Sequence, residues 1–365
     1  VRWLGVNLCR MLLSLTFILS GIVKLIDPVG TQYKIEDYAQ AFGLSALLPG
    51  FVPLLLAVGL AFVGFDLGIC LFFGSHRKRA SRFCLLFLAL MTPLTLYLAL
   101  DNPVSDCGCF GDAFTLTNWQ TFYKNLILLV AAVFVVWYYR MMTRFVLERN
   151  QWIINLYSKV FAFVFVCINL YGLPVWDFRP YHIGADLLQK MALDTDSASV
   201  ETYFLMEKDG VQKEFSLENY PDSTWTFVDA RTVLVSGAAE DASVDFSFID
   251  SHGNPVGNEI VQQKGPVFFI SIYNAKALGP RAVKKIMNLA DTLYRHNLQL
   301  YIISANSVET TQALFEPYEQ EDGRTYSILY SDYKAVISFN RSSGGLTYVN
   351  SGIIIKKWAR GNYPS

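Results

Sequence analysis

Two cysteines stand one residue apart in the sequence DCGCFGD, residues 106–112. A disulfide between Cys107 and Cys109 would be strained, and strained disulfides are easily reduced. Such a bridge closes so short a loop that it would add little stability. The spacing therefore favours a redox-active pair over a purely structural bridge. The glycines Gly108 and Gly111 would leave the backbone open to the sulfur atom of another protein.

The other residues of this loop bear on its chemistry. The carboxylates of Asp106 and Asp112 disfavour a nearby thiolate, so the pair suits an acceptor disulfide better than an attacking thiol. Zinc would require about four ligands, and only these two acids and the distant His182 could join the cysteines. We therefore expect no metal here, and expect Phe110 to support the loop together with its acids and glycines.

The loop lies between long apolar segments. Of the residues, 53% are hydrophobic and 17% are charged, which is less charge than a soluble domain carries. Crossing a membrane takes about 20 mostly apolar residues. Five stretches meet this requirement, namely 4–26, 51–74, 82–100, 121–142 and 152–172. The first contains Arg10 and Lys24 and has no A-x-A cleavage site after it, so we expect a retained helix instead of a signal peptide.

Basic residues predict the direction of these spans. They gather in the segments 75–82 and 140–149, whereas residues 101–120 contain none. Loops rich in Lys and Arg stay on the cytoplasmic side. We therefore predict a membrane protein with a cytoplasmic N-terminus, which the family resemblance given below implies to be in a bacterial inner membrane. The cysteine loop and everything after residue 172 would be periplasmic, where disulfides persist.

One acid, Asp66, falls inside the second predicted span. An acid within the membrane is costly unless it is paired. Counted from the inner ends of their spans, Asp66 and Arg10 lie at similar depths, so we predict an ion pair between them that joins the first two spans. Lys24 falls at the outer end of the first span, and Pro28 should end that helix.

The second half of the chain has the pattern of an α/β domain. Residues 200–217 predict a hairpin around Asp209-Gly210, and 225–235 another strand. A hairpin over 243–256 is followed by strands at 266–273 and 298–306, helices at 280–297 and 308–318, and a closing hairpin at 346–359. This order predicts a thioredoxin-like fold. No cysteine follows Cys167, so we expect this domain to bind a partner and to carry no dithiol.

Three segments of the first half resemble a known family. SGIVKLIDPVGTQYKIEDYAQAFG (20–43), FDLGICLFFG (65–74) and DCGCFGD with NWQTFYKN (106–125) are similar to DoxX-like/MauE membrane proteins, in the Bacteroidetes-type form with a soluble tail, over roughly residues 2–190. The resemblance implies a four-helix membrane core. It also implies a link to maturation of methylamine dehydrogenase or to quinone and thiol redox chemistry. In the C-terminal domain, the pattern D-F-x-x-x-D-x-x-G (245–253) near its start and GIIIKKW (352–358) near its end resemble the TlpA/peroxiredoxin-like branch of thioredoxin folds.

These observations predict a multi-pass α-helical membrane bundle followed by an α/β thioredoxin-like domain. The expected parts are a four-helix domain (1–150), a fifth helix with an interfacial connector (151–190), a β-rich segment (191–242) and the thioredoxin-like domain (243–365).

Two functions remain open. One is an envelope redox or maturation factor that exchanges disulfides with a periplasmic client protein through Cys107 and Cys109. The other is a non-catalytic assembly or scaffold subunit of an inner-membrane complex. A quinone would serve the first as electron acceptor, but no motif specifies a cofactor site. Besides such a protein partner we expect contact with membrane lipid, and no nucleic acid, because the chain has no basic tail.

Overall fold

The computed structural model describes residues 1–44, 48–102, 108–114, 116–189, 200–208, 211–216, 226–234, 248–251, 254, 256–318 and 325–364. The chain forms two compact units. One comprises Val1–Arg179 together with Trp358–Ser365, and the other comprises Pro180–Lys357. The first is helical and contains the cysteine loop, while the second contains the strands.

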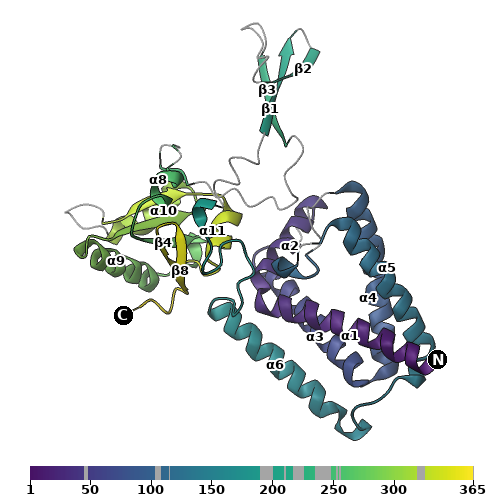
Figure 1. Ribbon diagram of the computed structural model, residues 1–365. Helices are drawn as coiled ribbons and strands as arrows, with labels where there is room; N and C mark the ends of the chain where they lie inside the picture. Colours follow the sequence, from purple (N-terminus) through teal and green to yellow (C-terminus); the bar gives the residue numbers. More distant parts are fainter. Residues whose placement is uncertain are drawn as a thin grey trace. The chain divides into compact units, whose positions relative to one another are not determined.

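Five helices of the first unit are long and apolar enough to cross a membrane. They are α1 (Arg2–Ile26), α3 (Val52–Phe73), α4 (Arg77–Asp101), α5 (Asn118–Trp137) and α6 (Gln151–Tyr171). In Figure 1, α1, α3, α4 and α5 form a bundle and α6 runs along one side of it. Many large apolar side chains on these helices are exposed, as expected where lipid surrounds a helix. The predicted multi-pass helical region is therefore present.

The fourth span begins and ends earlier than the sequence suggested. We expected it at 121–142, whereas α5 covers Asn118–Trp137. The Thr117 side chain accepts a hydrogen bond from the Gln120 amide, and the Gln120 side chain accepts one from the Thr117 amide. This reciprocal cap fixes the start of a helix. Its first turn is polar, so hydrophobicity alone placed the start too late.

A helix that we did not predict follows the first span. Pro28 does end α1, as expected, but it also begins α2 (Pro28–Ala41). The Asp27 side chain caps this helix by accepting a hydrogen bond from the Gly30 amide at 2.9 Å. Proline is favoured at the first position of a helix, where its missing N–H costs nothing. The pair Asp27-Pro28 therefore makes an elbow between two helices.

Helices α1 and α3 pack unusually closely. A Cβ atom on Gly68 would lie 2.7 Å from the backbone nitrogen of Ile18, and one on Gly21 would lie 2.6 Å from that of Phe65. Small residues allow membrane helices to approach in this way. The two contacts also show that the helices are antiparallel, because the numbering rises along one as it falls along the other.

The second unit is built on a mixed five-stranded sheet with the order β6-β5-β4-β7-β8. The strands are β4 (Pro266–Ile272), β5 (Gln299–Ser304), β6 (Ser327–Tyr330), β7 (Gly345–Asn350) and β8 (Ile353–Trp358). β5 lies parallel to both β4 and β6, and β7 pairs antiparallel with β4. All of the strands and helices that we predicted between residues 266 and 359 are present.

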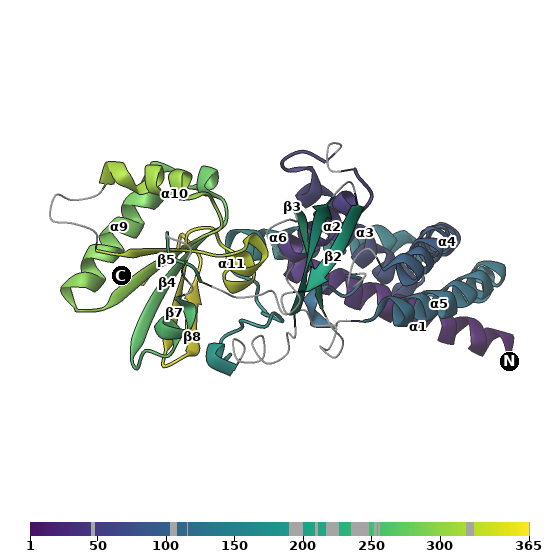
Figure 2. The same cartoon turned by 90° about the horizontal axis from the view of Figure 1, so that it is seen from above.

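Helices cover this sheet (Figure 2). They are α8 (Gly257–Val261), α9 (Pro280–Arg295), α10 (Val308–Phe315) and α11 (Tyr333–Phe339). Phe339 of α11 packs with Phe269 and Ile303 in one buried cluster. We missed α8, α11 and β6. β6 has only four residues and α11 only seven, and such short segments show too little periodicity to be recognised.

A separate three-stranded sheet has the order β2-β1-β3. It contains β1 (Val200–Lys208), β2 (Val211–Ser216) and β3 (Thr226–Leu234), all antiparallel. This confirms the predicted hairpin and third strand, although the turn at Asp209-Gly210 lies outside the described residues. Of the hairpin expected over 243–256, the described part includes a hydrogen bond from the Val256 amide to the Phe248 carbonyl.

The contact between α1 and α3 yields a stability prediction. Gly68→Ala should destabilise the bundle by about 1–3 kcal/mol, because the added methyl group would have to push the α1 backbone away. Gly59→Ala is the matched control, since it lies on the same helix with nothing within 4 Å of its Cβ position. Thermal unfolding in detergent should show a lower midpoint for the first variant alone. Equal midpoints would contradict the close packing.

Candidate functional site

The cysteine loop is attached to α1 through the main chain of Cys109. The Cys109 carbonyl accepts a hydrogen bond from Ser20 Oγ at 2.6 Å and a second from Lys24 Nζ. Lys24 Nζ also donates to Ser20 Oγ at 2.8 Å. Lys24 is only 6% exposed, so this charge is fixed in a nearly dry position. The two side chains thus clamp the loop at one of its two cysteines.

The sequence explains how α1 presents this clamp. Ser20 and Lys24 are four residues apart and therefore lie on the same face of the helix. Lys24 stands in the last turn, where a cation complements the helix dipole. We expected Lys24 merely at the membrane surface, and we overlooked Ser20. The motif S-G-x-x-K was the available signal, but only the fold reveals that its partner is a loop 85 residues away.

The glycines of the loop have a structural reason. Gly108 and Gly111 both have positive φ, at 60° and 54°, a conformation that other residues rarely adopt. A Cβ atom on Gly108 would lie 2.9 Å from the Lys34 side chain, and one on Gly111 would lie 3.2 Å from Val23. We predicted that these glycines leave room for a partner. In the structure they let the loop pack closely against α1 and α2.

The loop is also held by an aromatic side chain. Lys124 Nζ of α5 lies 4.6 Å from the centre of the Phe110 ring, within the range of a cation–π contact. The Phe110 ring in turn packs edge-on against Phe114. Phe110 therefore supports the loop, and three helices contribute to holding it.

Part of the predicted pair cannot be placed. Cys107 and Asp106 lie outside the described residues, as does the side chain of Asp112. Cys109 is described and is partly buried. The pairing of Cys107 with Cys109 therefore stays a prediction.

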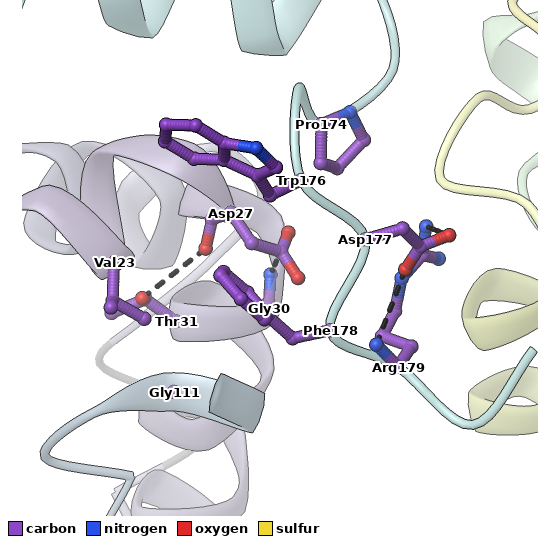
Figure 3. A pocket seen from close by; sticks show the side chains of 10 residues that line it. All are labelled: Val23, Asp27, Gly30, Thr31, Gly111, Pro174, Trp176, Asp177, Phe178 and Arg179. Carbon is purple, nitrogen blue, oxygen red and sulfur yellow. Dashed lines mark hydrogen bonds and ion pairs between the residues drawn. The ribbon is translucent and has the colours of Figure 1, made fainter. Parts of the chain in front are cut away.

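A small pocket lies beside the loop (Figure 3). It is lined by Val23, Asp27, Gly30, Thr31, Gly111, Pro174, Trp176, Asp177, Phe178 and Arg179. These residues come from the elbow between α1 and α2, the cysteine loop and the connector that follows α6. The connector is fixed by an ion pair in which Arg179 Nε lies 2.6 Å from Asp177 Oδ1. Its aromatic residues Trp176 and Phe178 line the pocket beside the loop.

Arg10 and Asp66 take different partners from those we expected. Arg10 donates to the Thr143 carbonyl and stacks over the Phe145 ring at 4.9 Å, and it is 1% exposed. Asp66 accepts a hydrogen bond of 2.9 Å from Ser158 of α6. Among the ion pairs of the described residues, none joins the two. Arg10 fastens a loop between helices, and Asp66 helps to hold α6.

The register of α1 and α3 explains this correction. Because Gly68 lies opposite Ile18, Asp66 lies at the level of Ser20. Ten residues, or about 15 Å at the rise of an α-helix, then separate that level from Arg10. Our depth estimate assumed that both helices begin at the same membrane plane. In fact α1 begins at Arg2 and extends beyond the end of α3.

The site can now be compared with known proteins. Residues 3–138 match the family model of Methylamine utilisation protein MauE. The matched segment contains α1 to α5 and so includes the clamp and the cysteine loop. It is shorter than the resemblance over 2–190 that we expected, and it ends before α6. Residues 200–237, which contain β1 to β3, match a Domain of unknown function (DUF8463). No curated protein matches the chain.

The different partners of Arg10 and Asp66 can be tested by mutant cycles. Arg10→Gln and Asp66→Asn should have additive effects on thermal stability, within about 0.5 kcal/mol, because distant residues do not couple. Asp66→Ala and Ser158→Ala are the positive control, since each substitution removes the hydrogen bond between these two side chains. A coupling of about 1 kcal/mol or more between Arg10 and Asp66 would restore the ion pair that we first expected.

Proposed function

We propose that this protein is a membrane accessory or maturation factor that exchanges disulfides with a periplasmic client through Cys107 and Cys109. The observation that carries the proposal is the clamp of Ser20 and Lys24 on the Cys109 carbonyl. It holds the main chain of one of the two loop cysteines in place against α1. The similarity to the family of Methylamine utilisation protein MauE supports an accessory role.

The electrons and protons of the proposed exchange balance between the client dithiol and the loop disulfide alone. A client thiolate attacks one sulfur of the Cys107–Cys109 disulfide and forms a mixed disulfide, while the other loop sulfur leaves as a thiolate. The second client thiol then displaces the loop, so the client gains a disulfide and the loop ends as a dithiol. Two electrons and two protons pass from client to loop. A membrane quinone is the class of acceptor that would restore the loop disulfide.

We assign client docking to the second unit. Its parallel strands β4 and β5 with the crossover helix α9, followed by the antiparallel β7 and by β8, have the order expected of a thioredoxin-like domain. No cysteine follows Cys167. At the carboxyl end of β4, the backbone of Asn274 is bonded to the Ser343 side chain, and the Asn306 side chain is bonded to Ala275. A polar network thus occupies the end of the sheet, which favours binding over exchange.

The distribution of charge supports the proposed orientation. At the end of the bundle where α4 begins and α5 stops, exposed basic residues gather, namely Lys78, Arg79, Arg82, Arg140, Arg144 and Arg149. The cysteine loop follows the far end of α4. The positive end is the one expected in the cytoplasm, so the cysteine loop would face the periplasm.

The orientation has a direct test. Alkaline phosphatase fused after residue 364 should be active in cells, because that enzyme requires an oxidising compartment for its disulfides. A fusion after residue 146, in the basic segment between α5 and α6, is the control and should be inactive. The reverse pattern would place the cysteine loop in the cytoplasm and would remove the basis for disulfide exchange.

The redox proposal is tested by trapping. Cys109→Ser cannot form the loop disulfide and so should oxidise no client. Its Cys107 thiolate should instead attack the disulfide of an oxidised client, the reverse of the second step, and the resulting mixed disulfide should appear as a heavier band that a reducing agent removes. Cys84→Ser is a matched control, because Cys84 is fully buried within α4. The double variant Cys107→Ser/Cys109→Ser should lose the heavier band and leave more envelope thiols reduced. If neither trapping nor envelope thiols change, the protein is instead a non-catalytic assembly subunit, for which the clamp merely fixes the loop shape.

A further inference from the structure

Three lysines from three different helices contact the cysteine loop, although the loop itself is acidic in sequence. Lys24 of α1 bonds the Cys109 carbonyl, the Lys34 side chain of α2 packs against Gly108, and Lys124 of α5 stacks on Phe110. The proposed disulfide exchange does not by itself call for so many cations. Their convergence requires an explanation.

The position of Lys24 has an electrostatic consequence. Its ammonium group bonds the main chain of Cys109, and the side chain is almost fully buried. Water screens a buried charge less than an exposed one. A cation next to a cysteine favours the thiolate over the thiol. A disulfide whose reduced form is stabilised in this way is a stronger oxidant.

We propose that Lys24 is the positioning residue that makes the cysteine loop an oxidant, so that its substrates are protein dithiols and not protein disulfides. This inference rests on the proposed function and adds a direction to it. In each turnover the client dithiol loses two electrons and two protons and becomes a disulfide. The loop disulfide gains the two electrons and one proton, so that Lys24 stabilises one sulfur as a thiolate while the second proton goes to solvent.

Lys24 both donates a hydrogen bond to the loop and supplies a positive charge, and a comparison with Ser20 separates these two roles. Both side chains donate to the same carbonyl, but only Lys24 carries a charge. If the loop needs only to be held in place, removing either donor should have a similar effect. If the charge determines the redox equilibrium, removing Lys24 should have a far larger effect than removing Ser20.

The experiment measures the redox equilibrium of the loop in the full-length protein. Purified protein in detergent is equilibrated with mixtures of reduced and oxidised glutathione or dithiothreitol, and free thiols are then alkylated. Mass spectrometry of the peptide that contains the loop gives its oxidised fraction, without interference from the other four cysteines.

We expect Lys24→Gln, which can still donate a hydrogen bond, to lower the equilibrium constant for reduction of the loop about tenfold. This is the effect of removing one nearby charge. Lys24→Arg should stay close to the wild type, and Ser20→Ala should change the constant much less than Lys24→Gln does. Lys78→Gln is the matched control, because this exposed lysine lies in the first turn of α4.

The outcomes are distinct. If Lys24→Gln and the wild type share one equilibrium constant, or if Lys24→Arg falls as far as Lys24→Gln, the role assigned to the charge is overturned while disulfide exchange stands. If the wild-type loop does not change oxidation state in any mixture, the proposed function itself fails. Should Lys24→Gln not fold, Ser20→Asp replaces it, since an acid next to Lys24 neutralises its charge and should lower the constant similarly.

Discussion

The bonds from Ser20 and Lys24 to the Cys109 carbonyl depend on several other features of the helical unit. α1 must end just after Lys24, which Pro28 ensures by beginning a new helix there. α2 must turn back beside the loop, which the Asp27 cap allows. The loop must also approach two helices closely, which requires glycine at 108 beside α2 and at 111 beside α1. Local sequence features thus combine to place one carbonyl against one ammonium group.

Some of this could be read from the sequence. The five spans and the helix α9 were predictable because long apolar runs and a strong periodic pattern identify them without tertiary information. At Asp27-Pro28 we predicted the end of the first helix but not the start of the next, since the same two residues can do both. Short elements such as β6 gave no usable signal. Their position is fixed by pairing with β5, not by their own sequence.

The candidate site was predictable in composition but not in geometry. The spacing of Cys107 and Cys109 directed attention to the loop, and its glycines were recognised, although for a different reason. The partner of Arg10 could not be found by counting residues from helix ends, because the register of α1 and α3 depends on where glycines permit contact. Lys24 was visible as a charge at the end of a helix. Its role depends on a carbonyl that is close only in the fold.

At both ends of the helical bundle, a cationic side chain of a helix donates a hydrogen bond to a loop carbonyl. Arg10 donates to the Thr143 carbonyl and Arg77 to the Met142 carbonyl, just as Lys24 donates to that of Cys109. In each case a cation of a helix satisfies a loop carbonyl that the membrane boundary would otherwise leave poorly solvated. At the basic end the bonded segment contains no cysteine, and the hydrogen bonds only fix the conformation of its backbone. At the other end the bonded residue is itself a cysteine, so the same contact brings a charge to the main chain of a cysteine. A contact that elsewhere only fixes a loop would then influence the chemistry of the protein, because the residue held here is a cysteine.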